Sequence, residues 1–232
     1  MTCICAVVDT DQSITFGADS AGSSEYAIMI TGSPKIFQKK NLLFGVAGSW
    51  RHMQLLHHAL VIPEQSYMCT DEAYITLHVT DAIRACFSER SNTQETSSCA
   101  ILIGYNGVLY RLNEDYGALI SYSYDCIGSG DDVAKGALFA TQAYSPVERI
   151  TTALKAATEH TAFVRQPYVF ERLAPCSEPH LGQASLFVQK TVRSLLTVKN
   201  EELGTLHMYH RGSTKGPSEG VRKGDECDGT AS

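Results

Sequence analysis

The stretch TCICAVVDTDQSITFGADSAG (residues 2–22) decides how the fold is read, because two apolar runs flank a polar turn. Residues 2–8 and 14–18 are rich in β-branched and small apolar side chains, and DTDQS (residues 9–13) lies between them. This pattern predicts a β-hairpin. Asp19 follows the second run directly, and Lys35 comes later, in GSPKIF (residues 32–37).

Thr2 is the first candidate for chemistry, provided that Met1 is removed. A threonine hydroxyl is a weak nucleophile unless a base lies beside it. An α-amine titrates near pH ~8 and can act as that base. An N-terminal threonine therefore carries the attacking group and the proton acceptor on one residue.

The rest of the chain to residue 173 alternates between strand and helix patterns. Two predicted strands flank Gly32 and are expected to pair with each other, and the Asn106-Gly107 dipeptide predicts a hairpin turn. The predicted strands are residues 26–31, 33–37, 41–48, 99–113 (a hairpin), 116–124 and 167–173. The predicted helices are residues 49–60, with Ser49 as N-cap, 71–87, 128–143 and a helix that Pro146 opens. This order predicts an α+β layered sandwich.

Composition and charge exclude several classes of function. The net charge is −6 and no dense Lys/Arg block occurs, which argues against binding to nucleic acid or anionic membranes. No long apolar run predicts a membrane span, and the N-terminus lacks the pattern of a secretory signal. Cys86, Cys99 and Cys126 lie in apolar segments and are predicted to be small buried residues, and no CxxC occurs. These features favour a reduced, cytoplasmic protein.

Two patterns that could indicate a bound group are better explained by structure. His52, His57 and His58 lack helical ligand spacing and an accompanying carboxylate, so no metal site is predicted. The glycine-rich GSG at 128–130 lacks the GK[ST] ending of a phosphate loop. We therefore expect no metal and no cofactor.

The chemistry-bearing residues together resemble the proteasome β-subunit superfamily, including HslV-like N-terminal nucleophile (Ntn) hydrolases. The resemblance rests on Thr2, GADS with Asp19, PKIF with Lys35, FGVAG with Gly48 and IGSG with Ser129. It covers about residues 2–173 and implies a four-layer αββα sandwich over residues 1–175. Residues 176–210 form an extension without clear periodicity, and the polar residues 211–232 predict a disordered tail.

The resemblance also implies a role for each residue. The Thr2 hydroxyl would attack a carbonyl carbon, and its amine would accept the proton. Lys35 would favour the unprotonated amine, and Asp19 would hold Lys35 in place. The Gly48 amide would donate to the oxyanion, and Ser129 would help to position the amine. Glu159 and Thr161 are further candidates near the amine, and Trp50 and Arg51 are candidates for shaping a specificity pocket.

The spacing departs from the family pattern by one residue. Asp19 and Lys35 each lie one residue further from Thr2 than is usual, which one extra residue in the turn 9–13 explains. Counted from Cys3, the usual spacing is met without an insertion, so Cys3 is an alternative nucleophile. Thr2 is preferred because methionine removal exposes it directly.

The implied function is a threonine-type peptidase. Its implied substrate is a peptide or unfolded protein, and its implied partners are further copies in a homo-oligomeric ring and an ATPase unfoldase. Two alternatives remain: a small-molecule amidohydrolase on the same fold, and a non-catalytic assembly protein that retains it.

Overall fold

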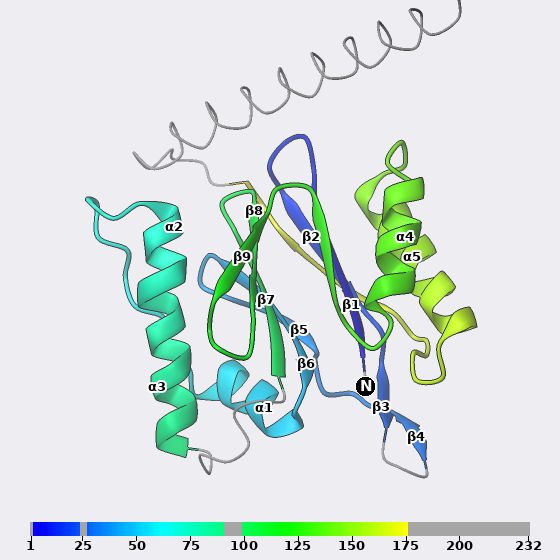
Figure 1. Ribbon diagram of the computed structural model, residues 1–232, viewed down its shortest axis with the longest axis horizontal. Helices are drawn as coiled ribbons and strands as arrows, with labels where there is room; N and C mark the ends of the chain where they lie inside the picture. The colour runs from blue at the N-terminus through cyan, green and yellow to red at the C-terminus, as the bar shows by residue number, and fades with distance from the viewer. Residues whose placement is uncertain (1, 24–26, 91–98, 176–232) are drawn as a thin grey trace, which may run out of the picture. The chain divides into compact units, whose positions relative to one another are not determined.

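The computed structural model describes residues 2–23, 27–90 and 99–175 (Figure 1). The predictions for residues 176–210 and 211–232 lie outside the described residues. Within the described ranges, antiparallel sheets combine with helices that follow them in the chain, which confirms the α+β class. No described helix has both the length and the apolar character needed to cross a bilayer.

The first sheet has four antiparallel strands in the order β10-β1-β2-β11. Its strands are β1 (Cys3–Val8), β2 (Ile14–Ala18), β10 (Tyr124–Gly128) and β11 (Val169–Leu173). The predicted hairpin is confirmed, since β1 pairs with β2 from Ile4↔Ala18 to Val8↔Ile14. β10 lies along the other edge of β1, with Cys3 opposite Gly128.

The second sheet has five antiparallel strands in chain order. They are β5 (Ile36–Lys39), β6 (Leu42–Gly48), β7 (Cys99–Tyr105), β8 (Val108–Leu112) and β9 (Ala118–Ser121). The predicted 99–113 hairpin is confirmed. Asn106 and Gly107 turn it with φ of 44° and 73°, the left-handed conformation that these two residues tolerate best.

Side chains alternate along β1 between two cores, as the pleat of a strand requires. Ile4 and Ala6 pack in a buried cluster with Leu43, Leu102 and Leu109 of the five-stranded sheet. The other residues of β1, which are Cys3, Cys5 and Val7, pack against α4 (Asp131–Ala140) and α5 (Pro146–His160) (Figure 1). The four-stranded sheet is therefore buried on both faces.

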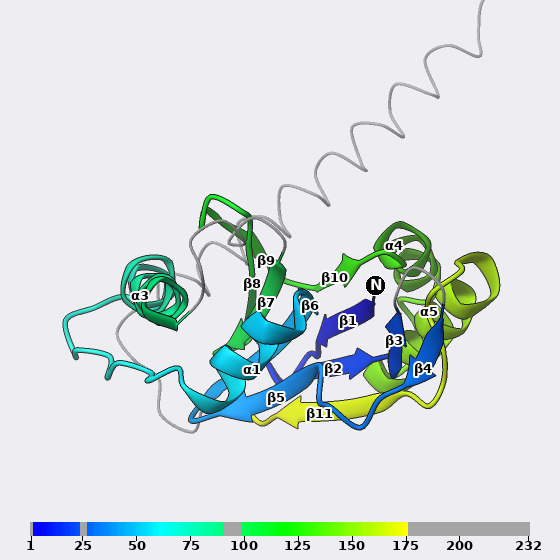
Figure 2. The same cartoon turned by 90° about the horizontal axis from the view of Figure 1, so that it is seen from below.

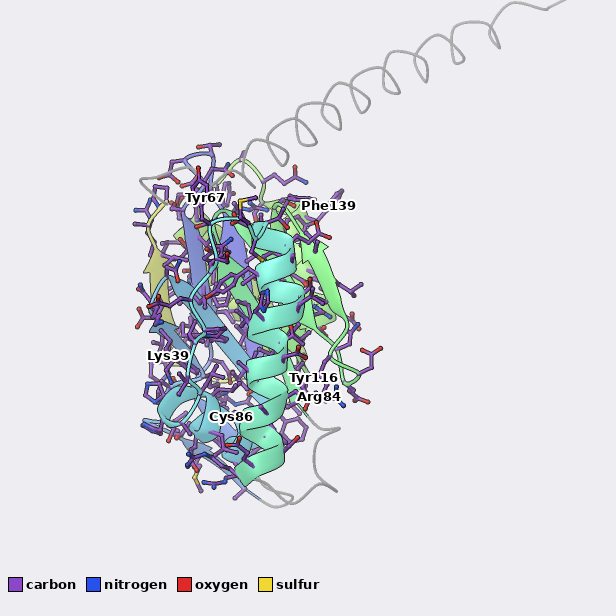
Figure 3. The ribbon with its side chains drawn as sticks, turned by 90° about the vertical axis from the view of Figure 1, so that its left-hand side faces the viewer. Lys39, Tyr67, Arg84, Cys86, Tyr116 and Phe139 are labelled. Atoms are coloured by element: carbon purple, nitrogen blue, oxygen red, sulfur yellow. The ribbon has the colours of Figure 1, made fainter. Side chains whose placement is uncertain are left out.

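Helices also pack on the five-stranded sheet. α1 (Trp50–His58) begins at Ser49, whose side chain accepts a hydrogen bond from the His52 N–H, as predicted for an N-cap. The predicted 71–87 helix is one helical segment of three parts, which are α2 (Asp71–Ala73), a π-helical stretch η1 (Tyr74–Val79) and α3 (Thr80–Arg90). Tyr74 meets Tyr105 of β7, with ring centroids 5.4 Å apart. Figure 3 labels Cys86 on α3, whose thiol lies 3.8 Å from the Leu55 carbonyl of α1.

Two sequence predictions about strands were wrong. Residues 33–37 do not pair with the preceding strand, because β5 pairs with β6, and β4 (Ile28–Ile30) pairs with β3 (Ala21–Ser23). The single strand predicted over 116–124 is divided, since β9 belongs to the five-stranded sheet and β10 to the four-stranded sheet. Residues 122–123 therefore carry the chain from one sheet to the other.

Candidate active site

A pocket of about 860 Å³ opens where the two sheets meet at the start of β1. Thr2, Gly128 and Ser129 line it from the four-stranded sheet, and Gly48 and Cys99 line it from the five-stranded sheet. Figure 2 shows the start of β1 beside the end of β10. Three of the five predicted site residues, Thr2, Gly48 and Ser129, are thus brought to one pocket.

The alternation of β1 distinguishes Thr2 from Cys3. The Cys3 side chain is fully buried in the helix-facing core, with its thiol 3.9 Å from that of Cys5. Cys3 does not line the pocket, whereas Thr2 does. Because neighbouring residues of a strand face opposite sides, Thr2 shares its side with Ile4 and Ala6, toward the other sheet. Thr2 is therefore the residue of the two that reaches the pocket, whereas burial lowers the pKa of Lys35 and Cys3 lies close enough to that lysine to oppose the decrease.

The hairpin register bears on the one-residue departure in spacing. β1 and β2 pair without a bulge from Ile4 to Val8, and the Asp19 N–H continues the ladder by donating to the Cys3 carbonyl at 3.2 Å. This register places Cys3 opposite Asp19, the spacing that needs no extra residue, so it does not itself support an insertion in the turn 9–13. Thr2 consequently stands one residue beyond the Cys3–Asp19 pair.

Asp19 and Lys35 form a buried ion pair. The Lys35 Nζ lies 2.7 Å from the Asp19 Oδ1, and their side chains are 1% and 0% exposed. The same Oδ1 accepts a hydrogen bond from the Cys3 N–H at 2.9 Å. The Oδ2 accepts from the Ala21 N–H at 3.0 Å and from the Arg165 N–H at 3.3 Å. One carboxylate oxygen thus joins the lysine to the peptide that follows Thr2.

Burial dominates the electrostatics of Lys35. Loss of hydration lowers the pKa of the Lys35 ammonium below its usual value, and the Asp19 carboxylate opposes that decrease. A lysine of this kind gives up a proton more readily than an exposed one. It also supplies a fixed positive charge where few waters can screen it.

Two glycines with left-handed backbone bring main chain close to the pocket. Gly48 has φ of 113° at the end of β6, and Gly128 has φ of 105° at the end of β10. A Cβ at position 128 would lie 2.1 Å from the Thr2 carbonyl oxygen. Ser129 follows, and its hydroxyl lies 3.4 Å from the same oxygen as a donor. Glycine at 128 therefore permits the contact between the Thr2 peptide and the end of β10.

Solved structures with similar folds complete this description. BPH from Thiobacillus denitrificans has a TM-score of 0.65 at 16% identity, over 76% of this chain and 100% of BPH. BPH in complex with epoxomicin gives 0.64 at 17% identity, over 75% of this chain and 100% of that one. HslV from Trypanosoma brucei gives 0.57 at 17% identity, over 75% and 99%.

The chain has the fold of BPH and HslV. The relation to proteasome-like and HslV-like proteins that the sequence predicted is therefore confirmed at the level of the fold. No family model matches the chain, and no curated protein matches it.

Other predicted residues lie elsewhere in this fold. Glu159 is exposed near the end of α5, and the Thr161 hydroxyl donates to the Ala157 carbonyl at 2.7 Å. Neither residue lines the pocket. Trp50 lines a separate, smaller hollow with Gly22 and Met29. Arg51 is exposed and lines another. Among the described residues, no group of histidine, cysteine and carboxylate side chains could hold a metal.

Sequence reasoning missed two contributors to the site. The Arg165 amide donates to Asp19 from a loop far along the chain, and no local pattern marks a backbone donor. Arg111 of β8 lines the pocket and binds Asp125 of β10 through two nitrogens. An arginine on the inward-facing side of a predicted strand was the available signal.

Proposed function

We propose that this chain is an N-terminal-threonine amide hydrolase, most specifically a peptidase of the proteasome and HslV type. One observation carries the proposal. A single oxygen of the buried Asp19 accepts from both Lys35 and the Cys3 amide, while the neighbouring Thr2 lines a pocket with Gly48 and Ser129. The proposed nucleophile and the Gly48 amide thus line one cavity, and the buried Lys35 is linked through Asp19 to the peptide that follows Thr2.

In the proposed mechanism, removal of Met1 frees the Thr2 amine. The Thr2 hydroxyl oxygen attacks the substrate carbonyl carbon, and its proton passes to the amine. The Gly48 N–H donates to the oxyanion, and the Lys35 charge keeps the amine unprotonated beforehand. The amine then protonates the leaving nitrogen, which leaves an ester on Thr2. Water, deprotonated by the same amine, hydrolyses the ester and restores the hydroxyl.

The packing supports the finer fold assignment within this proposal. Helices α4 and α5 pack on the four-stranded sheet, that sheet packs on the five-stranded sheet, and α1 contacts β6 on the latter. We assign these as the four layers of an αββα Ntn-hydrolase sandwich. The proposed cellular setting follows from the same relation: a cytoplasmic homo-oligomeric ring that takes peptides or unfolded protein, fed by an ATPase unfoldase.

Hydrolysis of fluorogenic peptides by Thr2→Ala, Thr2→Ser and Thr10→Ala tests the proposal. Thr10 is exposed in the turn, so its variant is a matched control for losing a threonine. Thr2→Ala should abolish hydrolysis, Thr2→Ser should retain part of it, and Thr10→Ala should retain all of it. Simple acyl amides run in parallel separate a peptidase from a small-molecule amidohydrolase. Full activity in folded Thr2→Ala would contradict the proposal and favour a non-catalytic protein.

A further inference from the structure

Arg111 and Asp125 form an ion pair that joins the two sheets beside the pocket. The Arg111 Nε donates to the Asp125 Oδ2 at 2.9 Å, and one terminal nitrogen donates to the Oδ1 at 2.7 Å. The same terminal nitrogen also donates to the Cys126 carbonyl. This is the bidentate geometry in which arginine binds a carboxylate most strongly and with most directional control.

The alternation of both strands shows that this pair spans the inter-sheet space. Leu109 of β8 and Ile127 of β10 pack in the cluster between the sheets. Arg111 and Asp125 lie two residues from them and therefore share those inner faces. The ion pair thus stands at the end of the apolar inter-sheet core, where Arg111 also lines the pocket.

Two further charged side chains, both from α4, lie close to the Arg111–Asp125 ion pair. Asp131 and Lys135 of α4 approach it, with Lys135 3.4 Å from Asp125 and Asp131 3.8 Å from both Arg111 and Lys135. The Arg111 and Asp125 side chains are 20% and 14% exposed, so water screens them only in part. Geometry at this position is therefore set by several charge contacts at once.

The two sheets that the ion pair connects form two walls of the pocket, and each sheet carries a different part of the proposed chemistry. β10 pairs with β1 and ends at Gly128 and Ser129 beside Thr2. The five-stranded sheet, to which β8 belongs, carries Gly48. The distance between Thr2, the proposed nucleophile, and Gly48, the proposed oxyanion donor, therefore depends on how the two sheets are placed relative to each other. A misplacement of about 1 Å between reacting groups can reduce a rate about 100-fold.

We propose that Arg111 and Asp125 form a positioning clamp that fixes the distance between Thr2 and Gly48 across the two sheets. The inference rests on the proposed function for its kinetic consequence, although its structural consequence is independent of activity. Arg111 acts through the placement of the two walls and has no proton-transfer role.

Arg111→Gln and Arg111→Lys test the clamp, with Arg172→Gln as matched control. Arg172 binds Asp11 at 3.1 Å, and both belong to the four-stranded sheet or its hairpin turn, so this ion pair does not bridge the sheets. Arg111→Gln should lower kcat for peptide hydrolysis by about 10- to 100-fold with a smaller change in KM. Arg111→Lys keeps the positive charge but cannot bind a carboxylate through two nitrogens, so its kcat should fall between those of Arg111→Gln and the wild type. Arg172→Gln should match the wild type.

Crystal structures of the wild type and Arg111→Gln provide the second readout. The distance from the Thr2 Cα to the Gly48 Cα should change by several tenths of an ångström or more in Arg111→Gln. An unchanged distance would overturn the clamp whether or not the chain is active. Unchanged kcat in an active protein would overturn it as well. An inactive wild type with a changed distance would instead refute the proposed function and leave the clamp standing.

Discussion

Replacing Asp19 with asparagine should destabilise the protein strongly, because it leaves the buried Lys35 ammonium without its counter-ion. The Asp19 carboxylate accepts from Lys35 and from the amides of Cys3, Ala21 and Arg165. An asparagine keeps one acceptor oxygen and turns an NH₂ group toward two of those donors. Removing one partner of a buried ion pair costs about 3–5 kcal/mol. At about 2–4 °C per kcal/mol for a domain of this size, Tm should fall by about 6–20 °C.

Urea titration followed by circular dichroism measures this change, with Asp11→Asn as control. Asp11 binds Arg172 in an ion pair whose side chains are 50% and 60% exposed, so its loss should leave the urea midpoint nearly unchanged. Adding Lys35→Met to Asp19→Asn removes the stranded charge, and this double variant should be more stable than Asp19→Asn alone. A loss below about 1 kcal/mol in Asp19→Asn would refute the reasoning from buried charge.

The pH dependence of the Asp19→Asn variant gives an independent check on the same charge. Burial lowers the pKa of Lys35, and loss of the opposing carboxylate lowers it further. Between that lowered pKa and the ordinary value of about 10.4, the unfolded state binds more protons than the folded state. Stability of Asp19→Asn should therefore rise with pH across this window, and the Lys35→Met double variant should lack that rise.

Two further predictions concern the walls of the pocket. Gly128→Ala should cost at least about 1–3 kcal/mol in urea titrations, because φ at position 128 is 105° and the new Cβ would meet the Thr2 carbonyl oxygen. Gly136→Ala, at an open helical site, should instead stabilise by about 0.5–1 kcal/mol, and equal effects at both positions would contradict the close contact. Burial raises the pKa of the Cys99 thiol to about 12, so Cys99 should remain almost entirely protonated at pH 8. Peptide mapping after iodoacetamide treatment at pH 8 should find the partly exposed Cys69 alkylated and Cys99 unmodified, and equal labelling would show that Cys99 is accessible.

Local sequence signals predicted the elements whose geometry local residues determine. The Asn106-Gly107 turn, the Ser49 N-cap and the hairpin of residues 2–18 depend on neighbours in the chain, and each is present. The partner of β4 was mispredicted, since a strand of three residues carries too little pattern to specify what it pairs with. The passage of the chain from β9 to β10 was also missed, because strands of four and five residues carry too little pattern to show which sheet each one joins.

In the candidate site, too, some residues were indicated by the sequence and some contacts were not. The residues Thr2, Gly48 and Ser129 were chosen by resemblance, and the fold brings them to one pocket, although their catalytic roles remain proposals. The Arg165 amide and the Arg111–Asp125 pair join segments that are distant in sequence. Such contacts depend on how the sheets pack, and a single sequence carries no periodic signal for them.

Intact mass and peptide mapping of the purified chain after treatment with epoxomicin, an epoxyketone, test the central claim most directly. A ketone accepts a hydroxyl and an epoxide carbon accepts an amine, so attachment through both requires the two groups on one residue. The account predicts a chain that lacks Met1 and carries one adduct, joined through the hydroxyl and the amine of Thr2. A chain that retains Met1, or an adduct on Cys3, would contradict it.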